Sequence, residues 1–310
     1  MAYKPELLAT AASIEELERL IAAGADAFVI GEARYGTRLA GEFSKEMIEM
    51  AVKIAKPKGV KIYAALNNLM DNEAAESLSE YVSALAEAGV DAFVFGDPAV
   101  LMAVRVHAPG KALHWNAEMT STNFETANYW GRRGATRFVL ARELNMEQVI
   151  DAINGTDLEV QVQVHGMTNI YHSKRSLVES YLEHQSEPDR LPQKNKDRGL
   201  YVMEAERQDE RYPIYEDANG THIMSSDDIC MVENLHELLE AGIGSLKIEG
   251  IMKSIEYNEI VVRSYREAID SYLADPSDYS FNEEWLEAIQ QVQDPNRELS
   301  YGFFYKEQVY

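Results

Sequence analysis

The segment Ala23-Gly24-Ala25-Asp26-Ala27-Phe28-Val29-Ile30-Gly31-Glu32 contains a pattern that returns three times further along the chain. The later copies read AGVDAFVFGD at 88–97, GATRFVLAR at 134–142 and AGIGSLKIEG at 241–250. Each copy predicts a helix that ends near a glycine, followed by a short buried strand that ends near a charged residue. Helices that alternate with single buried strands are typical of parallel strands joined by crossover helices. The repeat therefore predicts an α/β fold.

The register of the repeat places the remaining elements. We expect strands at 6–9, 27–31, 61–67, 92–96, 112–116, 137–141, 158–164 and 245–249, with helices between them and a long last helix at 254–273. Eight such units predict a (β/α)8 TIM-type barrel, in which the active site lies at the carboxyl ends of the strands.

The barrel is expected to span residues 1–275, with one interruption after the seventh strand and a short C-terminal extension at 276–310. The interruption is an insertion at about 167–225, where no strand–helix unit is visible. Turn residues at 216–220 predict a small hairpin within it. A long excursion at the carboxyl end of a strand usually forms a lid or a binding element.

Composition narrows the class of protein. The 310 residues are 46% hydrophobic, which is enough to bury a full core. The single cysteine, Cys230, excludes an intrachain disulfide and fits a reducing cytoplasm, and no apolar run of about 20 residues or signal-peptide pattern is present. We therefore expect a cytoplasmic protein with no membrane association. Its formal net charge of −23 repels polyanions, so any contact with nucleic acid needs a local basic patch.

The repeat also predicts which strand residues face the barrel interior. Phe28, Phe93, Phe138 and Leu246 should pack against the helices, so that Lys247 and Glu249 point inward. At the level of Glu249 the other copies carry only small residues: Gly31, Gly96 and Ala141. These are expected to leave space for the carboxylate, with Lys247 as its counter-charge. The pair is either purely structural or a working acid/base or ligand-orienting group.

Charged and polar residues gather at or just after the predicted strand ends. Glu249, Lys247 and His165 are the candidate catalytic residues. The candidate ligand-binding residues are Glu32, Asn67, Asp97, Glu118, Arg142 and Glu143. A rim with both arginine and carboxylates suits a small polar anion, which arginine binds through paired hydrogen bonds. The spacing of these residues does not indicate a particular metal ion. The sequence contains no zinc-protease motif, nucleophile elbow or P-loop.

The insertion is less acidic than the rest of the chain. Its basic residues are predicted to contact RNA or a partner protein: Lys174, Arg175, Lys194, Lys196 and Arg198.

Several short motifs, spread along nearly the whole chain, occur in the order typical of one protein family. They include LAREL at 140–144, VHG at 164–166, KIEG at 247–250 with KS at 253–254, YR at 265–266, and NR at 296–297 with GF at 302–303. Together with the repeated AGADA phrase they resemble peptidase family U-32, the collagenase-like peptidases. The resemblance implies RNA hydroxylation, because the family's bacterial members act on a tRNA wobble uridine or a ribosomal RNA cytidine, and others act in ubiquinone synthesis. It also implies a [4Fe-4S] cluster held by four cysteines, and prephenate as a partner metabolite.

The chain departs from the family at the cluster. The family's cysteine positions correspond to Asn169, Ser176, a residue near Tyr201, and Cys230, which alone is a cysteine. An all-cysteine cluster needs four thiolates, so no cluster is expected on this chain alone. The sequence is similar to a short, cysteine-depleted branch in Bacillus-type bacteria, which occurs beside a cysteine-bearing paralogue. The resemblance implies a component of 5-hydroxyuridine formation in tRNA that acts with that paralogue. A collagenase-like endopeptidase and a non-catalytic scaffold subunit are the alternatives.

Overall fold

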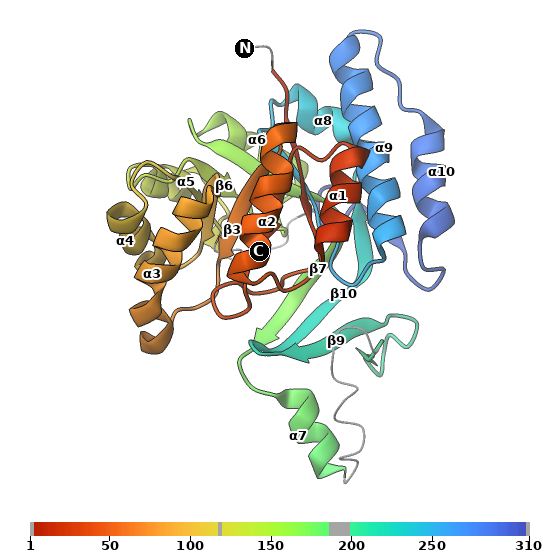
Figure 1. Cartoon of the computed structure of the whole chain (residues 1–310). Helices are drawn as coiled ribbons and strands as arrows, with labels where there is room; N and C mark the ends of the chain where they lie inside the picture. The colour runs from red at the N-terminus through yellow and green to blue at the C-terminus, as the bar shows by residue number, and fades with distance from the viewer. Residues whose placement is uncertain (1–2, 117–119, 186–198, 308–310) are drawn as a thin grey trace.

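Eight parallel strands close into a barrel in the computed structural model, which describes residues 3–116, 120–185 and 199–307 (Figure 1). Closure occurs because β11 pairs with β7 on one side and with β1 on the other. The predicted (β/α)8 barrel is confirmed. Its strands are β1 (Glu6–Thr10), β2 (Ala27–Ile30), β3 (Lys61–Leu66), β4 (Ala92–Phe95), β5 (Ala112–Trp115), β6 (Arg137–Val139), β7 (Glu159–Ser173) and β11 (Ser245–Ile248).

Helices cover the outside of the barrel, and the repeated phrase explains where they end. Gly24 and Gly89 cap α1 and α3 in the left-handed conformation, with φ of 110° and 96°. The outward residues Phe28, Phe93 and Phe138 are fully buried in the core between strands and helices, as predicted. The helices are α1 (Ile14–Ala23), α2 (Lys45–Ala55) with a 3-10 turn η1 (Lys56–Lys58), α3 (Asn72–Ala88), α4 (Pro98–His107), α5 (Phe124–Gly131), α6 (Met146–Asn154), α8 (Leu235–Glu240) and α9 (Ile255–Ala274).

The amino-terminal end of the barrel interior is closed by a buried charge network around Arg137. Its guanidinium lies 2.7 Å from a carboxylate oxygen of Glu6 and 2.7 Å from one of Glu159. The Tyr63 ring lies 5.1 Å from the guanidinium carbon. Above this floor, small and aliphatic side chains such as Leu8 and Val94 fill the barrel. The interior is therefore packed at this end, and the cavities described below lie toward the carboxyl ends of the strands.

The excursion begins inside β7. This strand passes the rim of the barrel and pairs antiparallel with β10 (Gly220–Cys230), so it is longer than the predicted 158–164. The predicted hairpin is confirmed as β9 (Tyr212–Asp217) and β10, and β10 carries the excursion beyond the predicted limit of about 225. The short strand β8 (Tyr201–Val202) and α7 (Leu177–His184) complete an arm that projects from the carboxyl end of the barrel (Figure 1).

The C-terminal extension packs back onto the barrel. Helix α10 (Glu283–Val292) lies against α9, and β12 (Leu299–Ser300) pairs with β10. The carbonyl of Phe304 accepts a hydrogen bond from the Met146 amide at 2.8 Å. Within the described residues, no helix is both long and apolar enough to cross a membrane.

Candidate active site at the barrel mouth

Glu249 and Lys247 meet at the mouth of the barrel, as the repeat predicted. The Lys247 ammonium donates to Glu249 Oε2 at 2.8 Å. The other carboxylate oxygen accepts from Thr10 Oγ1 at 3.2 Å and from the Ile251 amide at 3.2 Å. The Glu249 side chain is only 8% exposed, so the strand end and its loop hold a buried, fully hydrogen-bonded carboxylate.

A small pocket of about 40 Å³ surrounds this pair. Arg142 reaches it from the end of β6, where its Nε donates to Gln163 Oε1 at 3.0 Å. Asn67 reaches it from β3, and its Oδ1 accepts from the Thr37 amide at 3.2 Å. Three cations (Arg38, Arg142 and Lys247), a carboxylate and several amides thus face one space, which suits a small polar ligand.

The other predicted ligand-binding residues lie elsewhere. Asp97 caps α4, because its side chain accepts from the Ala99 amide at 2.8 Å. Glu32 contacts the Tyr81 hydroxyl, and Glu143 is exposed beyond β6; none of the three lines the pocket. Glu118 lies outside the described residues.

Gly31 does not leave space for Glu249, contrary to the prediction. A Cβ at Gly31 would lie 3.0 Å from both the Cβ and the carbonyl oxygen of Ala65 on β3. The glycine therefore permits close approach of the neighbouring strand, and Glu249 instead packs toward Thr10 and Lys247.

The prediction that His165 lies at the barrel mouth is also wrong. A register shift in the β7–β11 pairing aligns His165 with the outward-facing Ile248, so its ring lies behind the barrel. There its Nε2 is 2.8 Å from the Tyr257 hydroxyl of α9. Burial lowers the pKa of His165 to about 3, and the side chain is absent from the pocket lining. The imidazole is thus a neutral core group in this structure.

This burial predicts a pH dependence of stability. The unfolded chain protonates His165 near pH 6.5, whereas the folded chain keeps it neutral until about pH 3. The unfolded state therefore binds more protons in that window, and stability falls as pH drops through about 6.5, by up to ~1.4 kcal/mol per pH unit. His165→Gln should reduce this slope, measured by urea unfolding near pH 7 and near pH 5. Part of the slope should remain, because burial also lowers the pKa of His114. The exposed His107→Gln control should retain the full slope; equal slopes in wild type and His165→Gln would contradict the assignment.

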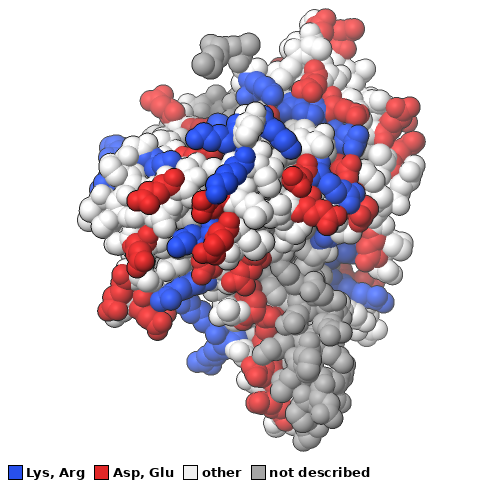
Figure 2. All heavy atoms as spheres, viewed as in Figure 1, with Lys and Arg blue, Asp and Glu red and all other residues white. Residues whose placement is uncertain are grey.

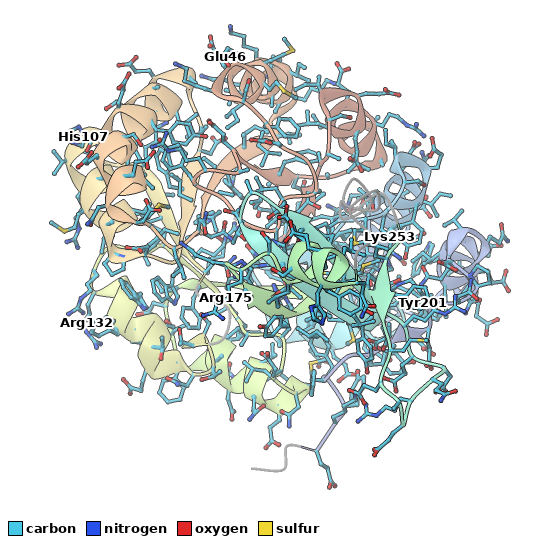
Figure 3. The ribbon with its side chains drawn as sticks, turned by 90° about the horizontal axis from the view of Figure 1, so that it is seen from below. Glu46, His107, Arg132, Arg175, Tyr201 and Lys253 are labelled. Atoms are coloured by element: carbon cyan, nitrogen blue, oxygen red, sulfur yellow. The ribbon has the colours of Figure 1, made fainter. Side chains whose placement is uncertain are left out.

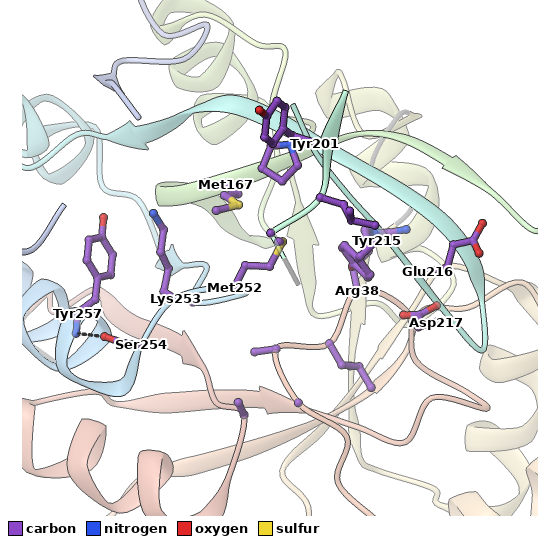
Figure 4. Close-up of a pocket in the computed structure, with 18 of the residues that line it drawn as sticks. Arg38, Met167, Tyr201, Tyr215, Glu216, Asp217, Met252, Lys253, Ser254 and Tyr257 are labelled. Atoms are coloured by element: carbon purple, nitrogen blue, oxygen red, sulfur yellow. Dashed lines mark hydrogen bonds between the residues drawn. The ribbon is translucent and has the colours of Figure 1, made fainter. Parts of the chain in front are cut away.

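A second, larger cavity joins the mouth. A cleft of about 1100 Å³ lies between the barrel loops and the hairpin of the excursion (Figure 4). Arg38 and Met167 line both the cleft and the small pocket. The loop at 36–41 therefore separates the two spaces, and a ligand in the cleft lies next to the Lys247–Glu249 pocket.

Residues whose roles the sequence analysis did not predict hold one wall of this cleft. Asp228 on β10 is completely buried, and its carboxylate accepts from Lys253 at 2.6 Å and from Arg297 at 2.8 Å. Gln293 donates to the same carboxylate at 2.7 Å. Lys253 and Arg297 also line the cleft. Lys253 belongs to the KS motif and Arg297 to the NR motif, so the motifs could have marked both residues as functional. Nothing in the sequence indicates that they contact Asp228.

The predicted basic surface is described only in part. Lys174 and Arg175 are exposed between β7 and α7, while Lys194, Lys196 and Arg198 lie outside the described residues. Figure 3 shows Arg175, Tyr201 and Lys253 around the excursion, in front of the barrel. On the face shown in Figure 2, basic and acidic side chains are interspersed over the helices.

The chain's donor set does not fit an all-cysteine iron–sulfur cluster. The Asn169 amide donates to the Ile223 carbonyl at 3.3 Å, Ser176 precedes α7, and Tyr201 lies on β8. Cys230 is buried at the end of β10, and burial raises the pKa of its thiol to about 11. One protonated thiol supplies none of the thiolates such a cluster needs.

Fold and motifs together define a barrel protein with a polar mouth and a large adjoining cleft, and comparison with known proteins identifies its family. The model of peptidase family U32 matches residues 12–309, and the chain belongs to this family. It is 50% identical over 308 residues to tRNA hydroxylation protein P2 of Bacillus subtilis (strain 168), covering 99% of both chains. It is 33% identical to tRNA hydroxylation protein P1 of the same strain, covering 99% of this chain and 74% of that protein.

More distant matches agree with the fold. The chain is 28% identical to the 23S rRNA 5-hydroxycytidine C2501 synthase of Escherichia coli (strain K12), over 89% of this chain and 41% of that enzyme. A solved structure described as a U32 peptidase superposes with a TM-score of 0.51 at 17% identity, covering 80% of this chain and 94% of that one. At that identity the superposition supports the barrel fold alone.

Proposed function

We propose that this protein is a component of tRNA hydroxylation that forms 5-hydroxyuridine at the wobble position. The observation that carries the proposal is the end-to-end match, at 50% identity, to tRNA hydroxylation protein P2. Because one cysteine cannot form the family's cluster, the protein acts together with a cysteine-bearing relative that supplies the redox centre. The P1 relative, which occurs beside P2 in one bacterium, provides the precedent for two such proteins in one cell.

The mouth pocket is the small-molecule site in this proposal. Arg142 and Lys247 bind a carboxylate of the ligand, and Glu249 orients Lys247 and exchanges a proton with the ligand when the pocket opens. A small dianion such as prephenate fits this chemistry. Opening is required because about 40 Å³ holds little more than one water molecule.

A peptidase function has less support from the site. Peptide hydrolysis by a side-chain nucleophile needs an accessible nucleophile beside a base. His165 is buried and hydrogen-bonded to Tyr257, and Cys230 is buried with a raised thiol pKa. The described residues contain no group of three or more metal-binding side chains. A pure scaffold would not need the buried Lys247–Glu249 pair at the mouth of the barrel, which favours a working site.

The proposal predicts a separation of stability from function at Glu249. Glu249→Gln keeps the shape and its contact with Thr10 but removes the charge opposite Lys247. In a deletion strain, this variant should restore little 5-hydroxyuridine in tRNA, measured by mass spectrometry of nucleosides, while the wild-type gene restores it fully. The melting temperature of the purified variant should stay within a few degrees of wild type.

Two results would count against the proposal. The proposed function would be wrong if tRNA from the deletion strain contained as much 5-hydroxyuridine as wild-type tRNA, both with and without the cysteine-bearing relative. A Glu249→Gln protein that is destabilised yet modifies tRNA fully would make the pair structural. Glu80→Gln, an exposed carboxylate on α3 that lines neither cavity, is the matched control.

A further inference from the structure

Two strained residues point to a built binding site in the cleft. Among the described residues, Arg38 and Met252 are the non-glycine residues with positive φ, at 56° and 60°. Both line the cleft. A bulky residue in this region is strained, and such strain persists where the surrounding structure enforces it, commonly at ligand sites. A glycine would relieve the strain at either position, so the retained side chains indicate a use for them.

The segments on both sides of each strained residue are firmly anchored. Before Met252, the Ile251 amide donates to Glu249; after it, Lys253 is held by Asp228 at 2.6 Å. These anchors present the Met252 side chain to the cleft, as Figure 4 shows.

The Arg38 loop is anchored in the same manner. The Thr37 amide donates to Asn67, and Gly41 lies so close to the loop after β1 that a Cβ there would be 2.1 Å from the Ala12 carbonyl oxygen. The loop therefore has little freedom, and the Arg38 side chain reaches the cleft beside the mouth pocket.

Tyr201 faces these two residues from the excursion. Figure 4 places it across the cleft from Met252 and Arg38. Its side chain is 45% exposed, and the Arg211 guanidinium lies 5.0 Å from its ring. An exposed aromatic ring opposite a thioether and a guanidinium forms a slot for a flat ligand, since aromatic, sulfur and guanidinium groups all stack favourably on a π-face.

We propose that Tyr201, Met252 and Arg38 form a slot that binds one unstacked nucleotide of single-stranded RNA. Enzymes that modify a base must take it out of the stack, and an aromatic platform with nearby cations is the usual receptor for single strands. Arg211 and Arg38, which line the cleft, supply positive charge to phosphates in a chain that is otherwise strongly acidic. The cleft, at about 1100 Å³, has room for the flanking nucleotides. The inference rests on the proposed function, because it places the RNA substrate beside the Glu249 pocket.

Direct binding tests the slot without any activity assay. The full-length protein is titrated, at low salt, into a fluorescently labelled single-stranded RNA heptamer with a central uridine, and into the same sequence in a duplex. We expect binding to the single strand and much weaker binding to the duplex. Tyr201→Ala should weaken single-strand binding about 5- to 150-fold, the equivalent of losing one stacked base.

Met252→Gly is the sharper variant. It relieves the positive-φ strain but removes the packing of Met252 against the cluster that contains Met167 and Tyr215. Its melting temperature should therefore stay within a few degrees of the wild type, while single-strand binding falls. Tyr181→Ala, which removes a 62% exposed tyrosine from α7 outside the cleft lining, is the matched control and should bind normally.

Three outcomes would overturn the slot. They are an absence of measurable RNA binding by the wild type, normal binding by Tyr201→Ala and Met252→Gly, and an equal loss in Tyr181→Ala, which would assign binding to the general surface of the excursion. Failure of the slot is distinguishable from failure of the function. If slot variants restore full hydroxyuridine in the deletion strain while Glu249→Gln does not, the function stands and the slot is wrong.

Discussion

Replacing Asp228 with Asn should lower the free energy of unfolding by about 3–5 kcal/mol, which is a large share of the stability of a typical domain. The Asp228 carboxylate is fully buried and neutralises Lys253 and Arg297, whose side chains are 7% and 9% exposed. The amide keeps the shape but leaves two buried cations without a counter-charge. It also releases the contact between the C-terminal segment and β10. Urea unfolding near pH 7 measures the loss, with the exposed Asp209→Asn as control.

The Asp228 carboxylate also predicts that the protein loses stability in acid. Burial alone would raise the pKa of Asp228, but Lys253 and Arg297 outweigh it and hold that pKa well below its usual range. Its contribution to stability is therefore complete above the unfolded pKa of about 3.9 and is lost as pH falls below that value. An Asp228→Asn protein as stable as wild type near pH 7 would refute this account of the cleft wall.

Replacing Arg137 with Met should destabilise the barrel by a similar amount, about 3–5 kcal/mol. The Arg137 side chain is 1% exposed and its guanidinium bonds Glu6, whose side chain is 8% exposed. The substitution fills most of the volume but leaves the buried Glu6 carboxylate paired with the exposed Lys61 ammonium alone among the described cations, at 3.7 Å. The double variant Arg137→Met, Glu6→Gln should recover part of the loss, because it also removes this weakly compensated charge.

A double-mutant cycle at urea denaturation measures this coupling. The partly exposed Arg19, which pairs with Glu256 and Glu259 on the surface, provides the matched control, and Arg19→Met should cost less than about 1 kcal/mol. Additive effects of the Arg137 and Glu6 substitutions would show that the buried pair does not hold the floor.

Some features of this protein follow from short stretches of sequence. The glycine that ends a helix and the alternation of the strand after it are local, so the repeated phrase sufficed to predict the barrel, the outward Phe28 and the inward Lys247 and Glu249. Their meeting at 2.8 Å follows from a spacing of two along one strand.

Other features depend on packing between distant segments. A register shift, invisible in the sequence, turns His165 behind the barrel, and the extension of β7 past the rim creates the arm that forms the cleft. Asp228, Lys253 and Arg297 come together only because β10, the loop before α9 and the chain after α10 converge. Sequence periodicity fixes the direction of a side chain on its own element; which partners it meets across the chain is decided by tertiary packing, because desolvated charges and strained turns are stabilised by contacts from several elements at once.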